Sequence, residues 1–188
     1  MFVKVEIDRV MARSRYKFLD NDFPYFITCT VINWIPIFSN PHIVQIILNS
    51  FTFLQEEKRL ILNAYVITEN HLHCVAQSAN ISKEVAAFKS FTGRSIVDHY
   101  KQNHNQFMLF QFKQNKKRFK TDREFQVWQE GSHPKQIQND KMLQQKIHYI
   151  HYNPVRRGYV ELPEHWRYSS AKNYMDQAGL IPVTKPWS

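Results

Sequence analysis

The chain has 188 residues, 43% of them hydrophobic and 14% aromatic, a composition that excludes a disordered protein and suits one folded domain. Lys and Arg number 25 against 16 for Asp and Glu, and the resulting net charge of +9 favours a polyanionic partner over a protein that is merely basic. The sequence has four glycines, two cysteines, no glycine-rich phosphate loop and no Cys-x-x-Cys pair, which argues against a nucleotide-cradling loop, a zinc ribbon or a redox motif.

The N-terminal sequence and the lengths of the apolar stretches indicate the cellular compartment of the protein. The first residues mix charges throughout, unlike a signal peptide, and the apolar stretches are too short to span a bilayer. We therefore expect a cytoplasmic protein with no membrane partner, in which Cys29 and Cys74 are free thiols.

The predicted elements follow the order β-α-β-β-α-β-α. Runs of aromatic and β-branched residues indicate strands, and apolar residues at helical spacing indicate helices. Strands are predicted at residues 24–34, 60–68, 71–78 and 124–129, and helices at 42–57, 82–102 and 139–152. This order predicts an α+β fold, a ferredoxin-like split βαβ sandwich with an antiparallel sheet and helices on one face. The main domain is expected over residues 23–160, between a basic arm at 1–22 and a tail at 161–188 that packs on it.

One histidine pair stands out on the third predicted strand. Side chains alternate across a strand, so His71 and His73 point to one face while Leu72 and Cys74 point to the other. Two adjacent imidazoles can hold one divalent cation, and with additional oxygen ligands the cation can be Mg²⁺ or Mn²⁺. The alternative interpretation is two half-exposed histidines of a surface strand, because a His-x-His pair is common by chance.

The last predicted helix carries a tyrosine at the border of its apolar stripe. Leu143, Ile147 and Ile150 form that stripe, while Tyr149 and Asn153 lie one turn apart on the adjoining flank. A tyrosine in this position can attack a phosphorus atom, and the Asn153 amide oxygen can join a metal site. The alternative is a packed aromatic ring with a solvated hydroxyl, which is the commoner role of such a residue.

A basic stretch follows the second predicted helix, at residues 103–123, with phenylalanines interleaved among its cations. Such a stretch can be a solvated loop, or a platform on which bases stack while cations follow the phosphates. Near the C-terminus, Trp166, Arg167 and Tyr168 can stack on an extruded base or cover the sheet edge, and we favour the covering role. The candidate DNA-binding cations are Lys116, Lys117, Arg118, Lys120, Arg123, Arg156 and Arg157.

Three motifs in this order resemble one known family. They are residues 69–74 (ENHLHC), residues 127–131 (VWQEG) and residues 149–158 (YIHYNPVRRG). The set resembles the single-tyrosine HUH transposases, in particular their REP-associated tyrosine transposase branch, from about residue 20 to about residue 175. The tyrosine-containing motif is the specific part of the set, and the histidine pair alone is common.

The resemblance implies an enzyme that cuts and joins single-stranded or hairpin DNA through a covalent 5′-phosphotyrosine intermediate. It implies His71 and His73 as ligands of a divalent metal and Tyr149 as the nucleophile. Asn153 stands where insertion-sequence members carry a glutamine ligand, so the resemblance implies it as a third ligand. Both monomers and homodimers occur in the family, and either is compatible with this sequence.

One departure from the family pattern leaves the function open. Some REP-associated members carry a tyrosine after the Trp-Gln motif, and Ser132 occupies that position here. Either Tyr149 is the nucleophile, or the chain is a catalytically inactive DNA-binding relative. A third alternative is a metal-dependent nuclease that uses water and leaves no protein attached to the DNA.

Overall fold

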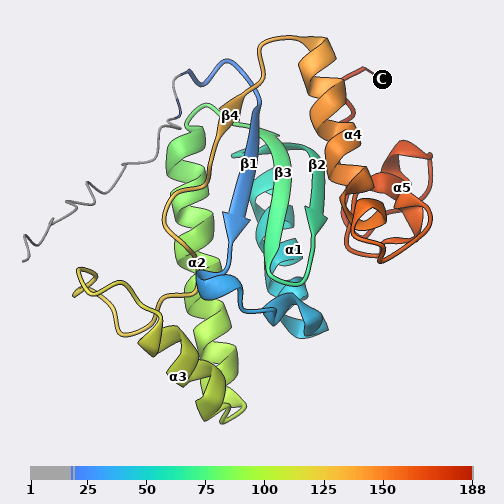
Figure 1. The fold of residues 1–188 in the computed structure, drawn as a ribbon. Helices are drawn as coiled ribbons and strands as arrows, with labels where there is room; N and C mark the ends of the chain where they lie inside the picture. The colour runs from blue at the N-terminus through green and yellow to red at the C-terminus, as the bar shows by residue number, and fades with distance from the viewer. Residues whose placement is uncertain (1–17, 19, 188) are drawn as a thin grey trace, which may run out of the picture.

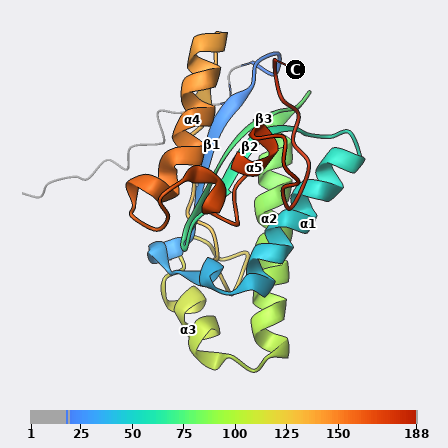
Figure 2. The same cartoon turned by 90° about the vertical axis from the view of Figure 1, so that its right-hand side faces the viewer.

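The computed structural model describes residues 18 and 20–187, which form a four-stranded antiparallel sheet with helices on both faces (Figures 1 and 2). The basic arm expected at residues 1–22 lies almost wholly outside the described residues. Among the described residues, no helix has both the length and the apolar character needed to cross a bilayer.

The sheet has the strand order β2-β3-β1-β4, and each neighbouring pair is antiparallel. This order is the one expected of a ferredoxin-like split βαβ fold, and the predicted fold class is confirmed. The strands are β1 (Tyr25–Thr30), β2 (Ile61–Ile67), β3 (His71–Gln77) and β4 (Lys135–Gln136). The α-helices are α1 (Pro41–Glu56), α2 (Ile81–Gln102), α3 (Gln106–Gln114), α4 (Asp140–Arg156) and α5 (Ala171–Tyr174). Short 3₁₀ turns lie at Ile32–Trp34, Ile37–Ser39 and Pro163–His165.

The three predicted helices begin at asparagine caps. The side chains of Asn40, Asn80 and Asn139 accept hydrogen bonds from backbone N–H groups in the first turns of α1, α2 and α4. Each cap satisfies a backbone donor that the helix itself leaves unpaired. These local contacts explain why the starts of all three helices were predictable from the sequence to within a residue or two.

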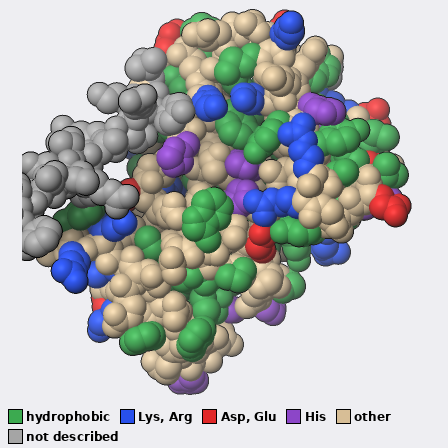
Figure 3. All heavy atoms as spheres, viewed as in Figure 1, with side chains coloured by type: hydrophobic (Ala, Val, Ile, Leu, Met, Phe, Trp, Pro, Cys, Tyr) green, Lys and Arg blue, Asp and Glu red, His purple; other side chains and the backbone are tan. Residues whose placement is uncertain are grey.

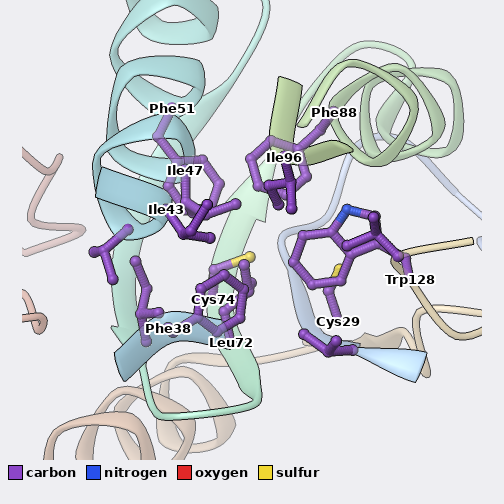
Figure 4. Close-up of a cluster of buried hydrophobic side chains, with 14 of the residues drawn as sticks. Cys29, Phe38, Ile43, Ile47, Phe51, Leu72, Cys74, Phe88, Ile96 and Trp128 are labelled. Atoms are coloured by element: carbon purple, nitrogen blue, oxygen red, sulfur yellow. The ribbon is translucent and has the colours of Figure 1, made fainter. Parts of the chain in front are cut away.

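The two faces of the sheet bury different side chains. On one face, Leu72 and Cys74 of β3 pack with apolar residues of α1 and α2, and Figure 4 shows this cluster. On the other face, Val66 and Val75 pack with the apolar stripe of α4. The prediction of helices on one face therefore holds for the crossover helices α1 and α2, whereas α4 covers part of the opposite face (Figure 2). The order of elements along the chain does not determine which face of the sheet α4 covers, because α4 follows the last strand and does not connect two strands.

The prediction of a fourth strand at residues 124–129 is wrong. Val127 and Trp128 are buried because they pack against α2, where Trp128 Nε1 donates a hydrogen bond to Thr92 Oγ1 at 3.0 Å. Only an isolated bridge between Val31 and Trp128 joins this segment to the end of β1, and β4 forms further along at Lys135–Gln136. Burial under a helix produced the apolar pattern that we interpreted as a strand.

The C-terminal segment covers the exposed edge of the sheet at β2. Trp166 Nε1 donates to the carbonyl of Ile67 at 2.9 Å, and the Ile67 N–H donates to the carbonyl of Tyr168 at 2.8 Å. The covering role favoured for this segment is confirmed. The backbone groups of Ile67 at this edge are therefore satisfied within the chain.

Candidate active site

The histidine pair lies on the α4 face of the sheet. His71 and His73 are only 4% and 7% exposed, and their ring centroids are 4.8 Å apart. Leu72 and Cys74 point into the opposite core, as the strand alternation predicted. The alternative of two half-exposed surface histidines is therefore excluded by their burial. Figure 3 shows histidine side chains near the centre of this face, with Lys and Arg side chains above and to the right.

Hydrogen bonds orient both imidazole rings. Asn70 Oδ1 accepts a hydrogen bond from His71 Nδ1 at 2.7 Å, which leaves the lone pair of His71 on Nε2. The Thr28 hydroxyl lies 2.8 Å from His73 Nδ1, a contact that does not involve Nε2 of His73, whereas the Thr68 hydroxyl lies 3.4 Å from Nε2 of His71. Polar groups that hold the second ring nitrogen are the usual supports of a metal-binding histidine.

The environment keeps both rings neutral. Burial, together with the positive charge of Arg157, lowers the pKa of His71 to about 4, although Glu69 opposes this shift. Burial and the neighbouring His71 lower the pKa of His73 to about 3. A neutral imidazole is the form that binds a metal, so both rings are in the binding form at neutral pH.

Tyr149 reaches the same place from α4. Its ring centroid lies 5.5 Å from that of His73, and both rings contact Phe26 of β1. The Arg156 guanidinium lies over the tyrosine ring, 5.4 Å from its centroid. The fold thus brings the predicted nucleophile next to the predicted metal ligands, although they are far apart in the sequence.

Asn153 lies one turn beyond Tyr149, inside α4. Its side chain is buried, and its Oδ1 atom has no hydrogen-bond partner among the described residues. A buried polar atom without a partner is costly, and a bound cation would satisfy it. Pro154 also lies inside α4, so Asn153 is a helical residue and not the last one.

The donor set bears on whether a metal fits. Among the described residues, no group of three or more His, Cys, Asp or Glu side chains is placed to hold a metal. Two neutral imidazoles, with ring centroids 4.8 Å apart on one face of β3, are a partial donor set. A divalent cation bound there would complete its shell with water or phosphate oxygens.

The predicted DNA-binding cations do not gather in one place. Arg156 and Arg157 lie at the end of α4 near the histidines, and Arg157 pairs with Glu69 at 2.7 Å. Lys120 pairs with Glu130 at 2.8 Å and Arg123 with the adjacent Asp122. The remaining candidates, Lys116, Lys117 and Arg118, lie in the segment after α3. The interleaved phenylalanines are not one platform either, because Phe112 is fully buried in the core.

Ser132 lies beside β1, where its carbonyl accepts a hydrogen bond from the Thr28 N–H at 2.9 Å. Its side chain hydrogen-bonds the Cys29 thiol, which belongs to the core on the α1 and α2 side. The position that carries a tyrosine in some relatives therefore directs its side chain away from His71 and His73.

Sequence reasoning missed Thr28 and Trp34 as parts of the site. Thr28 faces His73 because the two residues are paired across β1 and β3. The Trp34 ring packs edge-on against His71, with 5.8 Å between centroids. Strand pairing would have pointed to Thr28, since residues of one face alternate with period two. The sequence carried no signal for Trp34.

Comparisons with known proteins agree with the motif resemblance. No family model matches the chain. A protein of Haemophilus influenzae described as a REP-associated tyrosine transposase is 31% identical over 111 residues, which are 57% of this chain and 56% of that protein. The chain thus matches little more than half the length of this curated relative. A solved structure of a REP-associated tyrosine transposase bound to a REP hairpin matches with a TM-score of 0.61 and 18% identity, over 95% of this chain and 92% of that one. In its sequence motifs and in its fold, the chain resembles the REP-associated tyrosine transposases.

Proposed function

We propose that the chain cleaves and rejoins single-stranded or hairpin DNA, with Tyr149 as the nucleophile. The observation that carries this proposal is the position of the Tyr149 ring beside His73, on a face of the sheet lined by neutral, oriented imidazoles. The similarity to proteins described as REP-associated tyrosine transposases supports it.

In the proposed reaction, the Tyr149 oxygen forms a bond to phosphorus while the bond from phosphorus to the 3′ oxygen breaks. The proton lost by the tyrosine is balanced by the proton that the departing 3′ oxygen takes up. The 5′ phosphate stays attached to the enzyme, and a 3′ hydroxyl rejoins the strand by the reverse attack. Arg156, which lies over the tyrosine ring, is placed to attract the phosphate.

We propose Mg²⁺ or Mn²⁺ as the cofactor, held by His71, His73 and Asn153. Such a cation, when bound, would polarise the scissile phosphate and offset its negative charge. The chain's own contribution is to keep the imidazoles neutral and oriented through Thr28 and Asn70. The buried, unpartnered Oδ1 of Asn153 is the observation that supports it as the third ligand.

The decisive experiment traps the covalent intermediate. The full chain is incubated with a hairpin oligonucleotide that carries a single-stranded 5′ extension, with Mg²⁺ or Mn²⁺, and is resolved on a denaturing gel. We expect a protein–DNA adduct that Tyr149→Phe abolishes and Tyr152→Phe preserves, because the Tyr152 ring is 39% exposed and stacks on His148, whereas the Tyr149 ring packs against His73.

The other outcomes separate the alternatives. Binding without an adduct under either metal would identify a DNA-binding relative that does not cut. Free 5′ phosphates without attached protein would identify a nuclease that uses water. An adduct that persists in Tyr149→Phe would refute the assignment of the nucleophile.

A further inference from the structure

A pocket of about 480 Å³ opens beside Trp34. It lies between the turn that follows β1 and the segment that leads from α3 back to the sheet, two parts of the chain that run side by side in Figure 1. Its size is in the range of small-molecule sites. The side chains that give it chemical character are those of Asn33, Trp34, Asn115, Lys117, Gln129 and Glu130.

Trp34 joins this pocket to the histidine pair. Its indole is 56% exposed, yet its ring also packs edge-on against His71. The backbone that holds it is strained, because Asn33 and Trp34 both have positive φ, 51° and 56°. Bulky residues avoid this region, and strain of this kind concentrates at functional sites. Asn70, which also orients His71, donates to the Trp34 carbonyl at 3.3 Å and supports the turn.

The amide groups of the pocket are available to a ligand. Within the described part of the chain, the side chains of Asn33 and Gln129 make no hydrogen bond, and that of Asn115 uses its Nδ2 atom on Gln111. Amides carry a donor and an acceptor side by side, which matches the edge of a nucleobase. An exposed indole and free amides together are what an unpaired base needs for stacking and hydrogen bonding.

The charges of the pocket also suit a nucleotide. Lys117 forms no ion pair with any other described residue, so its ammonium group is available to a phosphate. The carboxylate of Glu130 is paired with Lys120 at 2.8 Å, which offsets its repulsion of a phosphate. The exposed Phe107 and Phe110 of α3 are the rival platform, but neither lines this pocket.

We infer that the pocket binds one unpaired nucleobase of the DNA strand, stacked on Trp34, with its phosphate near Lys117. The inference rests on the proposed function in that it places this base next to the phosphate that reacts at the histidine pair. It gives Trp34 a positioning role, distinct from the chemistry of Tyr149.

Binding measurements on the full chain test the stacking contact. The Tyr149→Phe background prevents cleavage, and the probes are the oligonucleotides dT15, dA15 and dC15 at one fixed salt concentration. We expect Trp34→Ala to weaken binding about tenfold and Trp34→Phe to retain most of the affinity, since a base stacks on either ring. Trp187→Ala is the matched control, because Trp187 is similarly exposed, at 48%, and does not line the pocket.

Equal affinities for Trp34→Ala and Trp187→Ala would overturn the inference. Far-UV circular dichroism and melting temperature establish that Trp34→Ala folds, and Trp34→Phe supplies the test if it does not. With that variant, the measurement is quenching of tryptophan fluorescence by iodide. In the parent protein we expect dT15 to reduce the quenching, and in Trp34→Phe we expect dT15 to have no such effect. Protection by dT15 that persists in Trp34→Phe would count against the pocket.

Photo-crosslinking maps the base directly. We expect dT15 with 5-iododeoxyuridine in place of thymidine to crosslink to a peptide that contains Trp34. Crosslinks confined to Phe107 or Phe110 would place the base on α3 and refute the pocket. Because neither assay needs cleavage, a missing covalent adduct would refute the proposed reaction without touching this inference.

Discussion

The two faces of strand β3 bury side chains of different kinds, apolar on one face and polar on the other. Leu72 and Cys74 face a core of apolar side chains from α1 and α2, where burial itself is the stabilising contribution. His71 and His73 are almost as buried, but their partners are polar: the side chains of Thr28, Thr68 and Asn70 hydrogen-bond the two rings. The difference shows that one face of the sheet is held by apolar packing alone, while the other also buries hydrogen-bonded polar side chains.

The largest expected effect is on the apolar face. Replacing Leu72 by Ala leaves a cavity between the sheet and α1, because the side chain is fully buried. We expect the free energy of unfolding to fall by about 3 kcal/mol, as for other buried leucines. Urea denaturation measures it, and a loss below about 1 kcal/mol would mean that this face relaxes around the cavity.

The matching change on the other face is expected to act on metal binding. His73→Ala removes one of the two imidazoles, and we expect the affinity for Mn²⁺ to fall by about 100-fold or more, because losing a ligand costs at least as much as losing an outer-shell partner. Electron paramagnetic resonance of free Mn²⁺ measures the affinity without DNA. Cys74→Ala, one residue on and on the other face, is the control and should bind as the parent does. Equal binding by both variants would rule out a metal at the histidine pair.

A smaller effect is expected from the group that orients His73. Thr28→Val preserves the shape of the side chain but removes the hydroxyl that lies 2.8 Å from His73 Nδ1. The ring loses its support, and we expect Mn²⁺ affinity to fall by roughly tenfold. Thr30→Val, on the same strand, serves as the control because no described histidine bonds its hydroxyl. An unchanged affinity in Thr28→Val would show that packing alone orients the ring.

The smallest effect concerns pH and the stability of the α4 face. Burial lowers the pKa of His151 to about 4, so below pH 6.5 the unfolded chain binds a proton that the folded chain does not. Stability therefore falls as the pH drops from about 6.5 toward about 4, by about 1 kcal/mol for this residue between pH 7 and 5.5. His71 and His73 act in the same direction.

Substitution at His151 measures how much this residue contributes to the dependence of stability on pH. His151→Gln keeps a polar group for the Ser170 hydroxyl, which lies 3.0 Å from Nε2, but cannot take up the proton. We expect its melting temperature to depend less on pH than that of the parent, whereas Gln144→Ala, at an exposed and non-titratable position of the same helix, should leave the dependence unchanged. An identical pH profile in all three proteins would show that folding does not lower the pKa of His151.

The predictions that held concern features set by residues close together in the sequence, and those that failed concern features set by distant contacts. The helix starts depend on asparagine caps a few residues away, and the faces of His71, Leu72, His73 and Cys74 follow from strand geometry alone. The strand predicted at residues 124–129 failed because its pattern records burial, and burial under α2 resembles burial in a sheet. The helix α3 was missed because its caps and apolar residues lie in a stretch dominated by charge and amides.

The sequence by itself determined that His71 and His73 share a face and that Tyr149 flanks an apolar stripe, because both are matters of local periodicity. Only the tertiary structure decided that α4 packs on the histidine face, which sets the Tyr149 ring 5.5 Å from that of His73. It also decided that Trp34 stands between the histidines and a pocket. Contacts of this kind depend on how distant segments fill the space around the sheet, and no local pattern encodes that packing.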